Sequence, residues 1–467
     1  MSDAALATAS LATVAARLKK KEISPVEVTN AVLDRIAAVD GKVKAYVTVT
    51  ADEARQAARA AETEIAAGRY RGPLHGIPIG VKDLFYTRGV KTTASSKILA
   101  SFIPDYDATV VERLKQAGAI IVGKTNTHEF AYSVFSPPTR NPWDLDRIPG
   151  GSSGGSGAAV AASLCAAALG TDTGGSIRIP SALCGVVGIK PTYGRVSKYG
   201  VIPLSWTADH AGPIARTVED TALLLGVIAG HDPRDAASAD VPVPNYAAAL
   251  SGDVKGLRVG LPKQYYFEAI DPEVETAVRA AVKALEGRGA TVDEISLPSL
   301  AHIAGVHVAI VLTEAATYHE KWLRTRPDDY APDVRFGLEW GKLFTGMDYV
   351  QAQRVRELIR ADFAQALTRV DVIAAPTVPV AAPKVGESSV TIKGQAEGIL
   401  GAMIRLNRPS NHTGLPAASV PCGFTAGGLP IGLQLIAPAF DEATLLRATH
   451  AYQTVTDWHT RKPPFHE

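Results

Sequence analysis

The sequence predicts an α/β fold in which helices cover a mostly parallel or mixed sheet. Short apolar runs bounded by Gly and Pro have the length of buried strands. Segments of helical length lie between these runs, and strands that alternate with helices are typical of layered α/β domains. The chain has 467 residues, of which 46% are hydrophobic and 20% charged, so it can bury a large core.

The first elements of the chain are expected to be helices. Ser24, Pro25 and Glu27 form a capping box with Pro at the first helical position, which predicts a helix to about Ala38. A segment rich in Ala, Glu and Arg predicts a second helix over 52–67. Strands are expected at 77–81, 119–122, 370–375 and 433–436. Further helices are expected at 109–116, 158–169, 217–229, 272–286, 349–367 and 441–456.

Composition and charge exclude several classes of protein. The 48 basic and 47 acidic residues give a net charge of +1, which offers no field to concentrate nucleic acid or an anionic membrane. The 3 cysteines lie far apart and form neither a disulfide framework nor a CxxC site. The chain begins without a basic and apolar leader, and its longest nearly apolar run, 158–169, is too short to span a membrane. We therefore expect a soluble cytoplasmic protein without a nucleic-acid or membrane partner.

Two motifs resemble nucleotide or metal sites only in part. Residues 118–125 fit the P-loop pattern, but 119–122 is an apolar run that we expect to be a buried strand rather than a phosphate-binding loop. His319 and Glu320 begin like a zinc-protease helix, but Leu323 stands where the second His is required. No other His or Cys spacing suits a metal better, so we expect no metal site.

Two clusters of Gly and Ser, at 150–157 and 170–180, are the pattern that points to chemistry. A flexible linker would be polar on both sides, whereas the intervening segment 158–169 is apolar and would hold both loops against a core. Rigid Gly-rich turns present backbone N–H groups without obstructing side chains, as an oxyanion hole beside a nucleophilic hydroxyl requires. The clusters therefore indicate serine-based acyl transfer, with two flexible loops as the alternative interpretation.

A serine nucleophile needs a base, and neither cluster contains the GxSxG pattern of Ser-His-Asp hydrolases. Lys82 follows the apolar strand 77–81, so its amine would lie at the end of a buried strand without a compensating carboxylate. Burial lowers the pKa of a lysine and lets the amine act as a base. The alternatives are a surface lysine paired with Asp83, and a base among the histidines His75, His128 and His210.

Residues 80–83 and the two Gly-Ser clusters resemble the defining motifs of the amidase signature family. The spacing agrees, because 24 positions separate Ser152 from Ser176, and the likeness runs from the N-terminal helices to about Trp458. The resemblance implies an amidase-signature fold, with a central mixed β-sheet sandwiched by helices. It also implies three parts: N-terminal helices at 1–70 packed on the main domain, a single amidase signature domain at 71–460, and a tail at 461–467.

The same resemblance implies a Ser-Ser-Lys triad without a cofactor. Ser176 would be the nucleophile, Ser152 the bridging hydroxyl after a cis peptide bond, and Lys82 the base. Asp172 and Arg178 would support the loops. The oxyanion would be held by the backbone N–H groups of Thr173, Gly174, Gly175 and Ser176.

Membership of this family implies cleavage of amide-type C–N bonds, in an amide, anilide, urea or carbamate, through an acyl-enzyme. The alternative is the A subunit of an aminoacyl-tRNA amidotransferase, which residues 141–144 and 190–195 also resemble. Two departures weaken that alternative: Ile179 stands where the subunit typically has Gln, and the chain ends soon after Trp458. Residues 318–320 also look more like stand-alone amidases. We therefore expect a stand-alone amidase with a small-molecule amide as its partner, and we leave the oligomeric state open, a homo-oligomer included.

The acyl pocket is expected beside the segment 127–134. Aromatic residues line many such pockets, although most aromatic side chains in a protein belong to its core. The candidate pocket residues are Phe130, Tyr132, Phe135, Ile179, Trp206 and Trp340.

Overall fold

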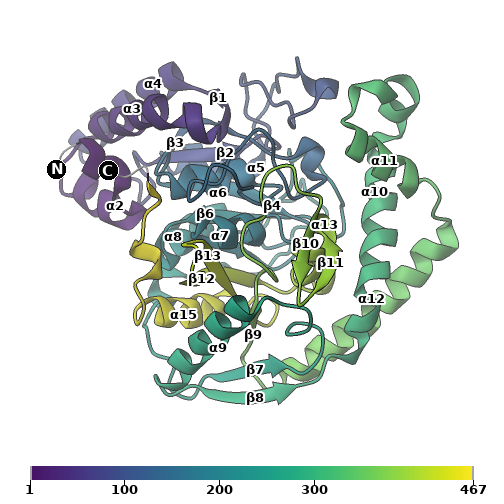
Figure 1. The fold of residues 1–467 in the computed structure, drawn as a ribbon. Coiled ribbons are helices and arrows are strands. Elements are labelled where there is room, and N and C mark those ends of the chain that lie inside the picture. Colours follow the sequence, from purple (N-terminus) through teal and green to yellow (C-terminus); the bar gives the residue numbers. More distant parts are fainter. Residues whose placement is uncertain (1–2, 465–467) are drawn as a thin grey trace.

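A computed structural model describes residues 3–464, and one large sheet runs through the middle of the molecule (Figure 1). The sheet has the strand order β1-β3-β2-β4-β6-β5-β12-β13-β9-β7-β8, and β10 and β11 form a separate hairpin. The strands are β1 (Tyr46–Val49), β2 (Pro78–Lys82), β3 (Ile120–Thr125), β4 (Ala167–Asp172), β5 (Val187–Lys190), β6 (His210–Ala215), β7 (Arg258–Pro262), β8 (Thr291–Ile295), β9 (Val372–Pro376), β10 (Ser389–Ile392), β11 (Gln395–Gly398), β12 (Ala417–Phe424) and β13 (Pro430–Ile436).

The sheet is mixed, as the sequence predicts. β2 pairs in parallel with β3 and β4, and β7 with β8 and β9, whereas β4, β6, β5, β12, β13 and β9 pair with one another antiparallel. The helices are α1 (Asp3–Thr8), α2 (Leu11–Lys19), α3 (Pro25–Val43), α4 (Ala51–Ala66), α5 (Thr109–Gln116), α6 (Gly154–Ala161), α7 (Arg178–Cys184), α8 (Val218–Ile228), α9 (Pro272–Glu286), α10 (Ile303–Thr325), α11 (Pro332–Gly341), α12 (Gly346–Leu367), α13 (Ile399–Arg405), α14 (Arg408–Thr413) and α15 (Glu442–Gln453).

Helices flank this sheet in two sets. α6 and α7 contact each other and pack on the central strands, α6 on β2 and β4 and α7 on β5, β12 and β13. α15 contacts both α8 and α9, and these three helices pack on β5, β6, β9, β12 and β13. The expected α/β fold with a mixed sheet between helices is therefore confirmed.

The N-terminal helix α3 follows the expected capping box. The backbone N–H of Glu27 donates to Oγ of Ser24 at 3.1 Å, and the backbone N–H of Ser24 donates to Oε2 of Glu27 at 2.7 Å. The helix continues to Val43, beyond the predicted end at Ala38, because buried Val39 and Val43 extend its apolar face. β1 follows and pairs with β3, so part of the 1–70 segment belongs to the main sheet. The division at residues 70 and 460 stays a prediction, and 465–467 of the expected tail lie outside the described residues.

The helix predicted over 158–169 is wrong. α6 ends at Ala161, Ser163 takes a left-handed conformation with φ 59°, and the chain then forms β4 from Ala167. The error has a physical reason, because a run of small apolar residues has no period that distinguishes a buried helix from a strand buried on both faces. The consequence is that the second Gly-Ser cluster begins inside β4 and continues into the loop that follows the carboxyl end of this central strand.

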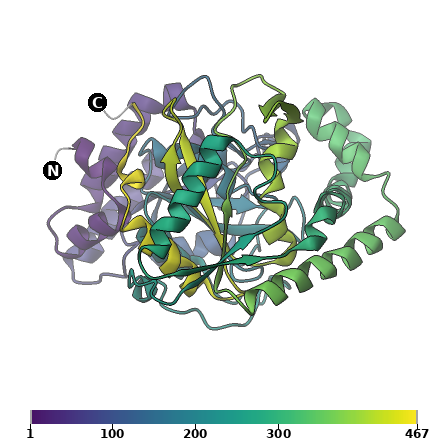
Figure 2. The same cartoon turned by 60° about the horizontal axis from the view of Figure 1, so that its bottom comes forward.

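The long helix α10 was not predicted from the sequence. Together with α11 and α12 it lies at one side of the layers, as the green ribbons show (Figures 1 and 2). The stretch Pro298–Thr325 is long and apolar enough to cross a membrane by composition, but 56% of its most apolar window is buried within the fold. The same test is passed by core helices, and α10 contributes its buried face to the wall of a cavity described below.

Candidate active site

Lys82 is the last residue of β2, and its side chain is fully buried. Its Nζ lies 2.8 Å from Oγ of Ser152, 2.9 Å from Oγ of Ser153 and 2.7 Å from Oγ1 of Thr171. Asp83 instead lies 3.5 Å from Nζ of Lys124. The alternative interpretation of Lys82 as a surface residue paired with Asp83 is therefore wrong.

The three hydroxyls around Lys82 match the hydrogen-bonding capacity of a neutral amine, which has two N–H donors and one lone pair. Oγ of Ser153 donates to the carbonyl oxygen of Thr171 at 3.0 Å, so it accepts from Nζ. When Nζ is neutral and its second N–H donates to Oγ1 of Thr171, its lone pair is left for the hydroxyl of Ser152. In this arrangement Nζ can take a proton from Ser152.

Burial lowers the pKa of Lys82 to about 7, and the charges of Asp209 and Asp172 oppose this shift. The direction agrees with the prediction. The expectation that no carboxylate compensates is wrong, because the fold brings Asp209 from the start of β6 to the same buried region. A lysine with a pKa of about 7 is neutral in a large fraction of molecules at physiological pH.

Ser152 lies in a densely packed turn after the cis peptide bond Gly151–Ser152, which the family resemblance implies and the structure contains. Oγ of Ser136 donates to the carbonyl oxygen of Ser152 at 2.8 Å. A Cβ on Gly151 would lie 2.6 Å from Oγ of Ser136, and a Cβ on Gly155 would lie 2.4 Å from the backbone N of Asn126. Glycine is therefore required for this close backbone approach, and the first Gly-Ser cluster is a buried turn that continues into α6 rather than a flexible loop.

Ser176 lies on the loop that joins β4 to α7, and its side chain is nearly buried, with 7% exposure. The two Gly-Ser clusters meet here, because the backbone N–H of Ser153 donates to the carbonyl oxygen of Ser176 at 3.2 Å. Within residues 3–464, Oγ of Ser176 makes no hydrogen bond with a protein atom. Its hydroxyl is thus free of protein partners and lies at the wall of a cavity.

The loop that carries Ser176 is held by a buried ion pair. Nη2 of Arg178 donates to Oδ1 of Asp172 at 2.8 Å, and both side chains are fully buried. The guanidinium of Arg178 holds the pKa of Asp172 well below its usual range despite burial. Asn411, on α14, accepts from Arg178 and donates to Asp172, and Gln434, on β13, accepts from Arg178. These contacts give the expected supporting role of Asp172 and Arg178 a structural basis.

Three of the four backbone N–H groups that were expected to hold the oxyanion make no hydrogen bond within residues 3–464. These three are the N–H groups of Thr173, Gly174 and Ser176. The N–H of Gly175 instead donates to Oδ1 of Asp172 at 2.8 Å. Buried backbone N–H groups are rarely left unpaired, so a cluster of three at one loop is suited to bind a negatively charged oxygen.

A mostly apolar cavity of about 500 Å³ opens beside Ser176. Tyr132 and Trp340, two of the six predicted pocket residues, line it. Gly337 allows α11 to approach Tyr132, because a Cβ there would lie 1.8 Å from the Tyr132 hydroxyl oxygen. The other lining residues are Ala131, Ser133, Val134, Thr173, Gly174, Ser176, Leu204, His307, Val308, Val311, Leu312, Pro332, Asp333, Phe336, Gly337, Leu400 and Ile404.

The remaining predicted pocket residues lie elsewhere. Phe130 is fully buried in an aromatic cluster, where its ring lies 4.3 Å from that of His319. Ile179 packs against the loop that carries Ser176, where its side chain would contact a Cβ on Gly175 at 2.7 Å. Phe135 lines a separate cavity of about 750 Å³ together with His128. These residues are close to the pocket residues in sequence, but their side chains point elsewhere. The direction of a side chain depends on the local backbone and cannot be inferred from sequence proximity.

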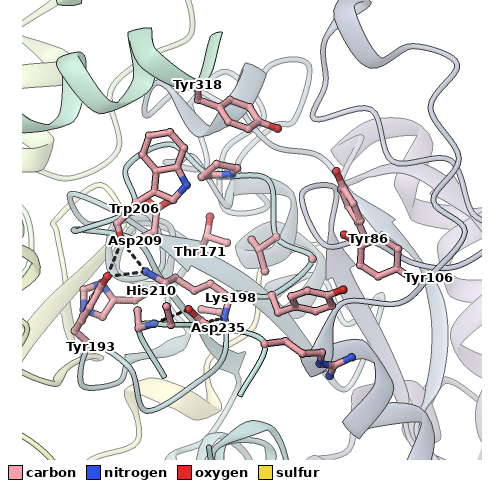
Figure 3. Close-up of a pocket in the computed structure, with 18 residues that line it drawn as sticks. Tyr86, Tyr106, Thr171, Tyr193, Lys198, Trp206, Asp209, His210, Asp235 and Tyr318 are labelled. Atoms are coloured by element: carbon pink, nitrogen blue, oxygen red, sulfur yellow. Dashed lines mark hydrogen bonds between the residues drawn. The ribbon is translucent and has the colours of Figure 1, made fainter. Parts of the chain in front are cut away.

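Trp206 lines another cavity, of about 460 Å³, which Figure 3 shows with Thr171, Asp209 and His210. Thr171 connects Lys82 to this second cavity, because its Oγ1 accepts from Nζ of Lys82 and the residue also lines the cavity. Trp206 is thus close to the supporting groups of Lys82 rather than to the cavity at Ser176.

Sequence reasoning missed four residues of this site: Ser153, Thr171, Asp209 and His307. Ser153 and Thr171 lie within the two Gly-Ser clusters at 150–157 and 170–180, so their membership of those clusters was a usable signal. Asp209 and His307 carry no such signal, because they reach the site only through the pairing of β6 and the packing of α10.

The structure agrees with the rejection of the P-loop and zinc motifs. The apolar run of the P-loop match lies at the start of β3, and Nζ of the buried Lys124 donates to the carbonyl oxygen of Phe85 at 2.6 Å. His319 is fully buried, and its Nδ1 lies 2.9 Å from the hydroxyl of Tyr330. Of the alternative bases, His75 lies 3.2 Å from Glu64 and His128 lies 3.3 Å from Asp333. Neither contacts the serines.

Comparison with known proteins places this site in a family. A family model described as Amidase matches residues 27–446. The chain belongs to the amidase signature family. Its amidase signature relatives include an amidase of Pseudomonas putida, 50% identical over 97% of each chain. They also include the A subunit of a glutamyl-tRNA(Gln) amidotransferase of Roseiflexus sp. (strain RS-1), 49% identical over 96% of each chain.

A solved amidase signature structure has the same architecture. It belongs to a study of a vestigial protein complex and the evolutionary origins of an s-triazine catabolic enzyme, and it superimposes with a TM-score of 0.92. The two chains are 35% identical, over 96% of this chain and 98% of that one. Chain length does not separate the two kinds of relative, because this chain spans 96% of the Roseiflexus amidotransferase chain. The expected distinction by the end at Trp458 is therefore not supported.

Proposed function

We propose that this amidase signature protein is a stand-alone hydrolase of small, uncharged amides, with Ser176 as nucleophile, Ser152 as proton relay and Lys82 as base. The observation that carries the proposal is a buried lysine with a pKa of about 7, in contact with a serine hydroxyl beside a loop of unpaired N–H groups. Perturbed groups that converge in this way are typical of catalytic sites.

The proposed reaction begins with neutral Lys82. Its Nζ takes the proton of Ser152, whose oxygen takes the proton of Ser176 as Oγ of Ser176 attacks the amide carbonyl carbon. The N–H groups of Thr173, Gly174 and Ser176 donate to the oxyanion of the tetrahedral intermediate. The proton on Lys82 returns through Ser152 to the leaving nitrogen, the C–N bond breaks, and water then hydrolyses the acyl-enzyme by the same route.

The cavity favours an uncharged, apolar substrate. Its lining contains no Lys or Arg, and its one acidic residue, Asp333, lies beside His128. Burial lowers the pKa of the lining His307 to about 3, so this residue also supplies no positive charge. A carboxylate transferred into such surroundings without a counter-charge loses its hydration without compensation. Aliphatic and aryl amides, anilides and carbamates suit the cavity better than glutamine, whose α-carboxylate needs a cation.

The second candidate function is that of an amidotransferase A subunit, which releases ammonia within a complex. The identity of 49% with such a chain over almost its whole length favours it. The absence of a cation from the described lining of the cavity at Ser176 speaks against it. We also propose a cytoplasmic location.

Turnover by the purified chain separates the two functions. Hexanamide, phenylacetamide, an acetanilide, a carbamate, a urea and glutamine are each incubated with the protein, with and without EDTA, and ammonia or amine release is measured. The proposal expects hydrolysis of at least one apolar amide, at the same rate in EDTA, and little release from glutamine. If ammonia is released from glutamine and from none of the other substrates, or if release requires added partner chains and glutamyl-tRNA, the amidotransferase function would be favoured instead.

A further inference from the structure

A pair of buried histidines, His307 and His412, lies at the wall of the cavity, and His307 is the one that lines it. Nδ1 of His307, on α10, lies 3.0 Å from Nε2 of His412, on α14, and the ring planes are perpendicular at 90°. His307 is 9% exposed and lines the cavity at Ser176, whereas His412 is fully buried. The proposed mechanism does not use either residue.

The free nitrogen of His307 lies beside the nucleophile loop. A Cβ built on Gly174 would be 2.9 Å from Cε1 and 3.5 Å from Nε2 of His307. Gly174 is two residues before Ser176 and supplies one of the unpaired N–H groups. Within residues 3–464 no hydrogen-bond partner of Nε2 is found. The nitrogen therefore lies next to the position where the acyl group of a substrate would be held.

The hydrogen-bond partners determine which nitrogen of His307 carries the proton. Neutral imidazole has one donor and one acceptor nitrogen, so one of the two rings must donate along the contact between His307 and His412. If His307 donated, His412 would carry its proton on Nδ1, a buried atom without a partner among the described residues. Unpaired buried N–H groups are rarer than unpaired acceptors, so a lone pair on Nδ1 of His412 is the more favourable arrangement.

Both rings stay neutral, which keeps this arrangement over a wide range of pH. Burial lowers the pKa of His307 to about 3, helped by the charge of Arg408. Burial, the neighbouring His307 and the surrounding arginines hold the pKa of His412 well below its usual range. His412 thus donates from Nε2 to Nδ1 of His307, and His307 carries its own proton on Nε2.

We infer that the Nε2–H group of His307 is a specificity-determining donor, which binds an acceptor atom next to the scissile carbonyl of the substrate. His412 is a positioning residue that fixes the tautomer. The inference rests on the proposed function, and it names a narrower class: apolar amides with an uncharged acceptor oxygen near the acyl carbon, such as alkoxy- or aryloxy-acetamides and carbamates. In an otherwise apolar cavity, a substrate without such an oxygen leaves the donor unpaired.

A matched pair of amides tests the inference. Phenoxyacetamide and 3-phenylpropanamide differ by an ether oxygen in place of a methylene, and their Kd values are measured on the Ser176→Ala protein, which does not turn over. We expect phenoxyacetamide to bind about fivefold more tightly. His307→Leu should remove this preference, while His307→Gln, which keeps an N–H donor, should retain most of it. Equal binding of both amides to the His307 protein, or a preference that persists in His307→Leu, would overturn the inference.

The tautomer has an independent readout that does not depend on activity. In protein labelled with ¹⁵N-histidine, one- and two-bond couplings report which ring nitrogen is protonated, and His307→Gln assigns the signal. We expect the Nε2–H tautomer of His307 from pH 6 to 8 and its retention in His412→Gln. His412→Leu removes the donor to Nδ1, so it should raise the share of the Nδ1–H tautomer. A proton on Nδ1 of His307 in the unchanged protein, or an imidazolium at pH 6, would overturn the tautomer assignment. If the binding and NMR results hold while no amide is hydrolysed, the proposed function fails and the donor assignment stands.

Discussion

Oγ1 of Thr173 donates to Oδ1 of Asp209 at 2.5 Å, so the loop that carries Ser176 is tied to a carboxylate that also acts on Lys82. Asp209 further accepts from the backbone N–H groups of Leu204 and Ser205, at 2.8 Å and 3.0 Å. One buried residue thus affects both the geometry of the nucleophile loop and the protonation of the base.

Replacement of Asp209 separates its charge from its tethering role. The negative charge of Asp209 raises the pKa of Lys82, so Asp209→Asn should lower that pKa and move the rising limb of kcat/KM to lower pH. Thr173→Val breaks the tether and keeps the charge, so it should lower kcat and leave the limb in place. Profiles of kcat/KM from pH 5 to 9 check this. An unchanged limb in Asp209→Asn, or an equal shift in both variants, would contradict it.

Substitutions of Lys82 test its role as base. Lys82→Ala removes the group that takes the proton and should lower kcat at least about 1000-fold, within the range of losses known for catalytic groups. Lys82→Arg should be as inactive, because a guanidinium does not deprotonate in a protein. Circular dichroism and the thermal midpoint serve as controls for folding. Turnover near that of the unchanged protein in Lys82→Arg would mean that Lys82 is an electrostatic support.

The oxyanion loop has no room for a side chain at Gly174. A Cβ there would lie 2.9 Å from the ring of His307, so Gly174→Ala should displace the loop and lower kcat by about 10- to 100-fold. Gly305→Ala, two residues before the same histidine on α10, is the matched control, because a Cβ at Gly305 meets no atom within 4 Å. Steady-state kinetics on one amide compare the two. A similar loss in both variants would show that the effect is not local to the loop.

The buried ion pair at the loop predicts a large effect on stability. Arg178→Met leaves the carboxylate of Asp172 buried without its partner, so the free energy of unfolding should fall by about 3–5 kcal/mol. Arg178 depresses the pKa of Asp172 in the folded state, so the pair stabilises the fold above the unfolded pKa of about 3.9, and this contribution is lost as the pH falls. Denaturant unfolding at pH 7 measures the change. Arg335→Met at a surface ion pair is the control and should change the midpoint little, and equal midpoints for both variants would contradict the account.

The sequence predicted most elements whose signal is local. The capping box at Ser24, the amphipathic segments 109–116 and 272–286 and the apolar run before Lys82 each depend on neighbours within a few residues, and each lies where it was expected. The segment 158–169 failed because a run of small apolar residues has no distinguishing period. Asp209, His307 and the support of Arg178 by Asn411 depend on contacts between distant strands and helices, which no local pattern encodes. For the same reason, only Tyr132 and Trp340 of the predicted pocket residues line the cavity.

The rate at which a fluorophosphonate labels Ser176, measured as a function of pH, tests the central claim most directly. Neutral Lys82 is required to take the proton through Ser152, and its folded-state pKa is about 7, so the rate should rise with pH through about 7 and level off above about 8. Peptide mapping by mass spectrometry should place one adduct per chain on Ser176. A rate independent of pH between 5 and 9, or an adduct on Ser152 or Ser153, would contradict the account.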